Sequence, residues 1–431
     1  MTRFRPFRAV RFCQSKVGDM RAVVAPPYDV IDEESLSHFY EASPYNVVRL
    51  ILNRRGHAEA GDLFRDWLGS GLCRRDEESA FYLYSQDFEC EGKTLRRTGV
   101  IGALQLEPFS SGMVRPHERT FSKHKKDRLD LTLQVKANLS PIFGLYSNGS
   151  FSIQPEGGWQ AEADIDVVQD AVRHRMWTLR RPETVAAVEA AVAGRTIFIA
   201  DGHHRYETAL NYYGLVRPDL ALGSEDAGSD EDRPEAHVLA FLSTFEDPGM
   251  VILPTHRELL DSGGADHEEF AAELEKSFDL QRFERNADGR RRLLEGLAGL
   301  GRQRNSLAVA MRDLDCYLLA SRPLSSAAAS SPLAGLDVSV LHDEVIEGGL
   351  TRAGGGQASL AYGIDAADML DRVERGEIEG AFLLNATRSD QMSDVCMAGE
   401  LMPQKSTYFY PKLITGLVFH LLDASPLEGP G

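Results

Sequence analysis

The segment 195–214, RTIFIADGHHRYETALNYYG, holds the densest group of residues in the chain that could do chemistry. Thr196–Ala200 is a short apolar, β-branched run, which is typical of a buried strand. Asp201 and Gly202 interrupt this run. The residues that follow have the i, i+3, i+4, i+7 spacing of one helix face: Tyr206, Ala209, Leu210 and Tyr213. The pattern predicts a strand that leads through a glycine turn directly into a helix.

The start of such a helix is suited to anions, because it presents unpaired backbone N–H groups and a partial positive charge. A glycine there allows close backbone approach, and an arginine supplies a fork of donors for phosphate oxygens. We therefore predict that phosphates bind to Gly202, His203, His204 and Arg205.

Asp201 is an unexpected acid in an anion site. It suits a Mg²⁺ ion that accompanies the phosphates, or a hydroxyl or amine of the substrate. We count Asp201 and His204 as catalytic candidates and Asp201 as the metal candidate. The alternative is structural, with Asp201 capping the helix and the histidines making ordinary turn contacts.

Residues 111–136 form a basic island in an acidic chain. They contain seven Lys or Arg and three Asp or Glu residues, 7 − 3 = +4, whereas the whole chain carries −18. A local charge that opposes the global sign favours a polyanion such as a nucleotide. We predict that Arg119, Lys123 and Arg128 neutralise nucleotide charge, and the alternative is an ordinary solvated face.

Glu118 lies within this island. A carboxylate among cations is held ionised, so it could accept a proton from a hydroxyl group during phosphoryl transfer. Glu118 is our candidate for the general base. It could instead pair with Arg115 or Arg119, or cap a helix.

Five further residues are candidates for substrate binding. Tyr28 and Asp29 follow two prolines, which fix the backbone that carries them. His256 and Arg257 follow an apolar run, at or beyond a strand end. Lys405 precedes Ser406 and Thr407, but the glycines of a P-loop are absent, so it has no Walker role. Each of these residues could equally be structural.

DGHHR after a strand resembles the nucleotide-binding signature of the ParB/sulfiredoxin superfamily. More narrowly, most of the chain resembles the prokaryotic family known as domain of unknown function 1015. Six ordered blocks carry this resemblance: VVAPPYDVI (23–31), RPHERT (115–120), KKDRLDLT (125–132), IADGHHRYETAL (199–210), ILPTHREL (252–259) and MPQKSTYFYPKLITGLV (402–418). The resemblance implies a ParB/sulfiredoxin-like nucleotide-binding core. The superfamily includes free-serine kinases with a glutamate base in a similar His-Glu context, which by resemblance is Glu118.

Strand-like and helix-like runs alternate along the chain, which predicts an α/β or α+β fold. We expect a catalytic core over residues 1–245 and a smaller α/β domain over 246–431. The expected strands are Phe81–Ser85, Thr98–Leu106, Thr196–Ala200, Val238–Ser243 and Met250–Leu253. The expected helices are Leu63–Leu68, Ile165–Met176, Pro182–Val192, His204–Tyr213, His267–Phe278 and Asp365–Arg375. We expect a polar break at 53–62, loops at 223–235 and 322–335, and a frayed tail after Asp423.

Composition restricts the class of protein. The 431 residues are 43% hydrophobic and 26% charged, as in globular chains. A pI near 5.2 argues against nucleic acid or an anionic membrane as the main partner. Five scattered cysteines without CxxC spacing fit a reducing cytoplasm. We find no signal peptide and no apolar run long enough for a membrane helix, and therefore expect a cytoplasmic protein.

Together these features predict a nucleotide-dependent phosphotransferase, a small-molecule kinase that uses ATP or ADP with Mg²⁺. The expected acceptor is a small hydroxylated metabolite, best free L-serine, with O-phosphoserine as product. The alternatives are an O-phosphoserine phosphatase, a ParB-like partition protein, and a nucleotide sensor without kinase activity. The sequence does not indicate an oligomeric state.

Overall fold

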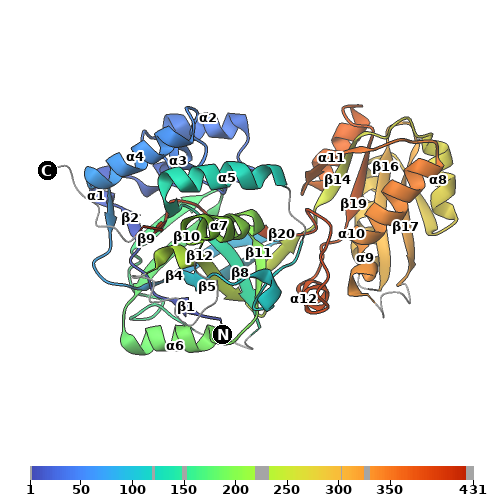
Figure 1. Cartoon of the computed structure of the whole chain (residues 1–431). Helices are drawn as coiled ribbons and strands as arrows, with labels where there is room; N and C mark the ends of the chain where they lie inside the picture. Colours follow the sequence, from blue (N-terminus) through green and yellow to red (C-terminus); the bar gives the residue numbers. More distant parts are fainter. Residues whose placement is uncertain are drawn as a thin grey trace. The chain divides into compact units, whose positions relative to one another are not determined.

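The computed structural model describes residues 2–118, 122–147, 153–218, 233–301, 303–324 and 331–423, without the side chains of 122–125. They divide into two compact units (Figure 1). Unit 1 contains the described residues of 1–116, 120–250 and 411–431, and unit 2 contains those of 117–119 and 251–410. Both combine helices with sheets, so the fold is α/β, as expected.

Unit 1 is built on a nine-stranded mixed sheet. Its strands, in spatial order, are β6 (Val114–Pro116), β11 (Ile197–Asp201), β8 (Ile142–Tyr146), β12 (His237–Thr244), β5 (Lys93–Gln105), β4 (Phe81–Cys90), β10 (Val172–Leu179) and β9 (Ile165–Gln169), with β1 (Phe4–Arg5) beside β5. The pairs β6–β11 and β8–β12 are parallel, and the other pairs are antiparallel. Two smaller ladders join β2 (Val10–Phe12) to β3 (Cys73–Arg75) and β7 (Ala137–Asn138) to β21 (His420–Leu421).

The helices of unit 1 are α1 (Gln14–Val17), α2 (Glu33–Ala42), α3 (Val48–Ile51), α4 (His57–Gly69), α5 (Ser122–Val135), α6 (Pro182–Val192) and α7 (His203–Val216). Alternate side chains of β12 pack with Val188 of α6 and with Tyr206 and Tyr213 of α7 in one buried cluster. Because strand side chains alternate between faces, this cluster covers one face of the sheet and fixes α7 against it.

Unit 2 contains a six-stranded antiparallel sheet in the order β15 (Asp279–Glu284), β17 (Cys316–Pro323), β16 (Arg304–Met311), β19 (Gly380–Leu384), β14 (His256–Asp261) and β18 (Ser359–Gly363). A separate ladder joins β13 (Val251–Leu253) to β20 (Tyr408–Tyr410). The helices are α8 (His267–Glu275), α9 (Ala287–Leu300), α10 (Asp337–Val340), the π-helix η7 (Leu341–Leu350), α11 (Ala366–Glu374) and α12 (Ser389–Met397). α9 and α11 cover one face of the sheet through a shared buried cluster.

The division between the units differs from the predicted boundary at 245/246. It falls after Met250, and residues 411–423 belong with unit 1. The physical reason is backbone pairing, since Phe419 exchanges hydrogen bonds with Val10, and Thr415 with Ala25. These long-range pairs leave no local signal in the sequence.

The predicted helix Ile165–Met176 is wrong, because this segment is the hairpin β9–β10. Asp170 and Ala171 form its turn with φ of 49° and 59°, as in a turn with two left-handed residues. Buried and exposed positions alternate along β9, and Val168 is 53% exposed. The period is therefore two, not 3.6.

The other predicted helices and strands have helical or strand counterparts, with ends shifted by up to several residues. The polar break at 53–62 overlaps the first turns of α4. Most of the predicted loop 223–235, part of 322–335 and the tail after Asp423 lie outside the described residues. Within the described part of the chain, no helix is both long and apolar enough to cross a membrane.

Candidate functional site

The predicted strand–turn–helix is present in unit 1. β11 ends at Asp201, Gly202 follows with φ 88° and ψ 29°, and α7 begins at His203. The left-handed conformation of Gly202 is costly for a residue with a side chain. A Cβ there would also lie 2.9 Å from the guanidinium carbon of Arg205. Glycine thus lets Arg205 fold back over the first turn of α7.

Asp201 is held between two cations. Its Oδ1 accepts a hydrogen bond from Lys412 Nζ at 3.1 Å, and its Oδ2 accepts one from Arg205 Nη2 at 2.6 Å. Arg205 Nη1 also donates to the Pro141 carbonyl. Burial alone would raise the pKa of Asp201, but the charges of Lys412 and Arg205 outweigh it and hold this pKa well below its usual range. Asp201 is therefore a carboxylate, and the cluster Asp201–Arg205–Lys412 carries a net charge of +1.

The segment that carries Lys412 is fixed by side chains of β4 and β5. Gln86 Nε2 donates to the Lys412 carbonyl at 2.9 Å, and Arg97 donates to the Pro411 carbonyl. Arg97 is fully buried over the ring of Phe143, and this burial lowers its pKa to about 10. Sequence reasoning missed Lys412, although it lies in the same block as Lys405. The contact of Lys412 with Asp201 spans 211 positions of the chain and leaves no local signal in the sequence.

A second contact brings two predicted residues together beside the cluster. The Arg128 guanidinium lies over the ring of Tyr28, 4.3 Å from its centroid. Both side chains line a small pocket of about 50 Å³ that also includes Arg205 and Thr208. Burial raises the pKa of the Tyr28 hydroxyl. Unit 1 thus groups Tyr28, Arg128 and Arg205, whereas Asp29 is exposed.

The structure describes some of the remaining predicted phosphate and metal contacts and not others. His203 is buried and His204 is partly buried in the first turn of α7. Arg119 and the side chain of Lys123 lie outside the described residues. No group of three or more His, Cys, Asp or Glu among the described residues could hold a metal ion. Each oxygen of Asp201 already accepts a hydrogen bond from a cationic side chain. Binding of Mg²⁺ to Asp201 stays a prediction.

Glu118 and Arg257 both belong to unit 2 and interact there. Arg257 is fully buried, donates to the Thr255 carbonyl and to His342 Nε2 at 3.2 Å, and lies over the ring of Tyr362. Burial lowers the pKa of Arg257 to about 10, while the charge of Glu118 acts to raise it. A role for Arg257 in substrate binding stays a prediction.

The other two candidates of unit 2 have structural settings. His256 Nδ1 accepts a hydrogen bond from the Leu384 backbone N–H at 3.1 Å, and burial lowers its pKa to about 4. This neutral histidine joins β14 to β19. Lys405 is exposed, with φ of 55°. Both residues belong to unit 2 and the Asp201 cluster to unit 1, so their roles in substrate binding stay predictions.

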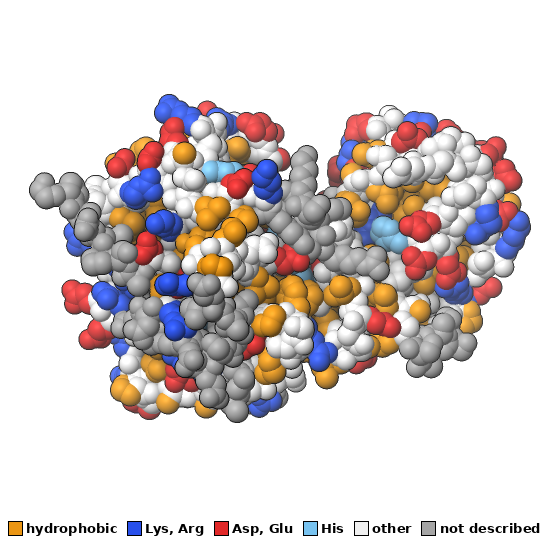
Figure 2. Space-filling model, viewed as in Figure 1, with side chains coloured by type: hydrophobic (Ala, Val, Ile, Leu, Met, Phe, Trp, Pro, Cys, Tyr) orange, Lys and Arg blue, Asp and Glu red, His pale blue; other side chains and the backbone are white. Residues whose placement is uncertain are grey.

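Charged side chains of both signs are interspersed on the face of the molecule in Figure 2. No large patch of one sign stands out on that face. The Asp201–Arg205–Lys412 cluster, with its net charge of +1, differs in sign from the whole chain, which carries −18.

A family profile described as "Protein of unknown function (DUF1015)" matches residues 4–339. The chain belongs to this family. The match confirms the family resemblance and includes five of the six sequence blocks, with the whole strand–turn–helix at Asp201, but not the block 402–418. It ends before β19 and α12 of unit 2.

Solved structures with similar folds are distant in sequence. A free serine kinase in complex with AMP is 13% identical, covers 69% of this chain and 83% of its own, and has a TM-score of 0.35. A conserved hypothetical protein from Pyrococcus furiosus is 12% identical, with coverages of 70% and 89% and the same TM-score. A free serine kinase variant in complex with ADP is also 12% identical, with a TM-score of 0.34 and coverages of 69% and 84%. No curated protein sequence gives a significant match.

Proposed function

We propose that this protein is a nucleotide-dependent phosphotransferase that acts on a small hydroxylated metabolite. The proposed donor is ATP or ADP, and the proposed acceptor is free L-serine, which gives O-phosphoserine. The observation that carries the proposal is the left-handed Gly202 at the start of α7, beside the Asp201–Arg205–Lys412 cluster. A ParB/sulfiredoxin-like origin of the core is part of the same proposal.

The phosphate site follows from charge and backbone geometry. α7 has fourteen residues, and the residue just before it is Gly202. A glycine has no side chain that could accept hydrogen bonds from the first N–H groups of the helix. The cluster beside it has a net charge of +1, which favours an anion at the helix start. Gly202, His203, His204 and Arg205 are the proposed phosphate contacts. Arg128, stacked on Tyr28, supplies further positive charge near Arg205.

Asp201 has a different role in this proposal. Because Lys412 and Arg205 keep it ionised, it cannot serve as an acid, but its oxygens can accept hydrogen bonds from a hydroxyl or amine of the substrate. Lys412 and Arg205 are the positioning residues that fix this carboxylate.

In the proposed reaction the substrate hydroxyl oxygen bonds to the terminal phosphorus of the nucleotide. The bond from that phosphorus to the bridging oxygen breaks, and the shortened nucleotide leaves. The hydroxyl proton goes to Glu118. β6 runs parallel to β11, with Pro116 opposite Ile199, so both strands end at the same edge of the sheet. Glu118 lies two residues after Pro116 in the sequence but belongs to unit 2, so its proposed role as the base rests on the sequence resemblance.

The test combines binding with product formation. Purified protein is incubated with ATP or ADP, Mg²⁺ and L-serine, and O-phosphoserine is measured by mass spectrometry, with nucleotide binding followed by thermal shift. A nucleotide at a hundredfold excess over Kd should stabilise the protein by about 2.7 kcal/mol, a shift of several degrees. Arg205→Ala should abolish the shift, whereas Arg173→Ala, an exposed arginine of unit 1, should leave it unchanged.

Glu118→Gln separates catalysis from binding. It should retain the nucleotide shift and lose the product, since the amide cannot accept the proton. Nucleotide binding that survives Arg205→Ala would remove the phosphate site from α7. Binding without a phosphorylated product from any hydroxy-amino acid would exclude the kinase. Phosphate released from O-phosphoserine without nucleotide would favour a phosphatase.

A further inference from the structure

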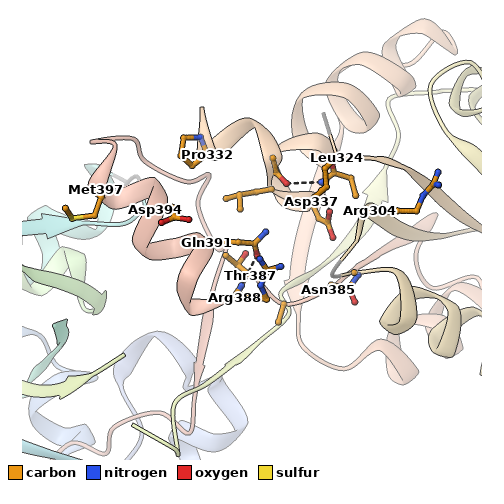
Figure 3. Close-up of a pocket in the computed structure, with 15 residues that line it drawn as sticks. Arg304, Leu324, Pro332, Asp337, Asn385, Thr387, Arg388, Gln391, Asp394 and Met397 are labelled. Carbon is orange, nitrogen blue, oxygen red and sulfur yellow. Dashed lines mark hydrogen bonds between the residues drawn. The ribbon is translucent and has the colours of Figure 1, made fainter. Parts of the chain in front are cut away.

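Unit 2 contains a second cavity that none of the residues predicted from the sequence lines. Its volume is about 390 Å³, within the range of small-molecule sites. Its walls come from the start of β16, the turn before α10, the segment after β19 and the first turns of α12 (Figure 3). The polar lining residues are Arg304, Asn305, Asp337, Asn385, Thr387, Arg388, Gln391 and Asp394. Part of this wall lies beyond the family match, which ends at residue 339.

The two arginines of the cavity already have partners outside it. Arg388 donates to Asp390 at 3.0 and 3.1 Å, and Arg304 donates to Asp279. The two acids of the cavity, Asp337 and Asp394, form no ion pair with any described residue. Asp337 and Asp394 are therefore the charged lining residues without an ion-pair partner, although the charge of Arg388 acts on Asp337.

Asp337 is the better defined of the two acids. Its Oδ1 accepts hydrogen bonds from Asn305 Nδ2 at 2.9 Å and from the Ser306 backbone N–H at 3.3 Å, both neutral donors. Burial raises the pKa of Asp337 to about 6, and the weaker hydrogen bonds and the Arg388 charge do not reverse this. The carboxylate is therefore less stable here than in water.

Asn305 gives a second, independent indication of a ligand. Its side chain is 1% exposed, and its Nδ2 is fixed by hydrogen bonds to Asp337 and to the Gly335 carbonyl. These bonds orient the amide, so its Oδ1 is the acceptor that lacks a partner among the described residues. An unpaired buried acceptor costs free energy unless a donor reaches it. Asn305 and Asp337 both line this cavity, and the Oδ1 atom of Asn305 is itself shielded from solvent.

We propose that this cavity binds a small molecule through a protonated amine, with Asp337 as its anionic partner. An ammonium group offers three donors and one positive charge. It would give Asp337 a direct ion-pair partner, and a donor to the Asn305 Oδ1 atom once the wall moves to expose that atom. Asp394 adds a second negative charge on the α12 side (Figure 3). This site is independent of the proposed phosphotransfer in unit 1.

The test uses two probes of equal length that differ in charge, 1,4-diaminobutane and 1,4-butanediol. Isothermal titration calorimetry on the full chain at pH 7.5 and 150 mM salt should detect binding of the diamine and none of the diol. Asp337→Asn should weaken diamine binding at least tenfold. Asp394→Asn, which alters an exposed acid of the cavity, should weaken it about two- to fivefold by removing one nearby charge. Asp343→Asn, an exposed acid of unit 2 outside the cavity, should have no effect.

Equal binding of diol and diamine would overturn the proposal, because the amine would not be recognised. If Asp343→Asn weakened diamine binding as much as Asp337→Asn does, the binding would be a general attraction between a cation and an acidic surface, which contradicts the proposal. Mg²⁺ that binds in an Asp337-dependent manner, while the diamine does not, would make this a metal site instead. If Asp337→Asn fails to fold, unchanged affinity in Asp394→Asn is the contradicting result.

Discussion

Asp201 in unit 1 and Asp337 in unit 2 are partly buried carboxyl groups in opposite electrostatic settings. Asp201 lies against Lys412 and Arg205, and these cations hold its pKa well below the usual range although burial acts to raise it. Asp337 lies against Asn305 and the Ser306 backbone, and burial raises its pKa to about 6. Burial is common to both, so the neighbouring charges decide which acid is stable as a carboxylate.

The two settings also indicate different roles. The Asp201 cluster is complete within unit 1, so its carboxylate can position cations and substrate without changing protonation. Asp337 has no ion-pair partner within the described chain and gains most from one supplied by a ligand. The following predictions test this difference, from the largest expected effect to the smallest.

Asp201→Asn should destabilise unit 1 by about 3 kcal/mol, because it leaves two cations partly buried without their shared anion. The Arg205 and Lys412 side chains are only 13% and 14% exposed. Urea unfolding followed by tryptophan fluorescence reports on unit 1 alone, since Trp67, Trp159 and Trp177 all lie there. The control Asp166→Asn breaks an exposed pair with Arg173 and should cost under about 1 kcal/mol. Equal losses in the two variants would show that the Asp201 cluster is not a tightly coupled unit.

Gly202→Ala tests whether backbone geometry sustains the cluster. The added Cβ meets the Arg205 guanidinium and also strains a residue with φ of 88°. We expect a loss of about 2 kcal/mol, a combination of backbone strain and a displaced arginine. Gly112→Ala is the matched control, because Gly112 is also left-handed, with φ of 71° and ψ of 1°, and a Cβ there would have its nearest neighbour at 3.6 Å, an ordinary contact. It should cost about 1 kcal/mol in the same tryptophan-detected unfolding. If the two glycine variants lost the same free energy of unfolding, the Arg205 side chain would make room for the added Cβ at no cost in stability.

Asp337→Asn should change stability in the opposite direction from Asp201→Asn. An acid whose pKa is raised to about 6 on folding contributes stability below its unfolded pKa, near 3.8, and loses it as pH rises through about 6. The neutral amide should therefore stabilise unit 2 at pH 8, on the order of 1 kcal/mol, and by less at pH 5. Asp201 has the opposite sign, since its contribution is present at neutral pH and is lost as pH falls toward its depressed pKa.

Hydrogen exchange of amides in β16 and β19 measures this effect within unit 2. Protection should rise in Asp337→Asn at pH 8, and the gain over the unaltered chain should shrink at pH 5. The control Asp343→Asn should show no such pH-dependent difference. Lower protection in Asp337→Asn at pH 8 would show that the carboxylate stabilises the fold, which contradicts the comparison.

The local elements around Asp201 could be predicted from the sequence. The β-branched run, the glycine and the helical spacing of Tyr206 and Tyr213 agree with one another, and the structure follows them closely. The hairpin at Ile165–Met176 could not, because its apolar residues fit a helix face nearly as well as an alternating strand, and Asp170-Ala171 is a weak turn signal. Short-range patterns predict elements where several signals coincide.

Contacts between distant segments were beyond sequence reasoning. Lys412 reaches Asp201 across 211 positions of the chain, and no local pattern specifies that pairing. The cavity of unit 2 depends likewise on the approach of residues 304–305, 335–337 and 385–394. The sequence identifies Asp337 as an acid, but it could not predict that Asp337 has no ion-pair partner among the described residues.

The return of residues 411–423 to unit 1 has a consequence for biosynthesis. Lys412, Thr415 and Phe419 complete contacts with Asp201, Ala25 and Val10, yet the ribosome makes them after the intervening chain of unit 2. Domains generally fold from the N-terminus as they emerge. Unit 1 therefore stays unfinished on the ribosome while unit 2 is translated. The surface of unit 1 that Lys412, Thr415 and Phe419 cover is exposed until then, and Asp201 has no ion pair with Lys412 during that time.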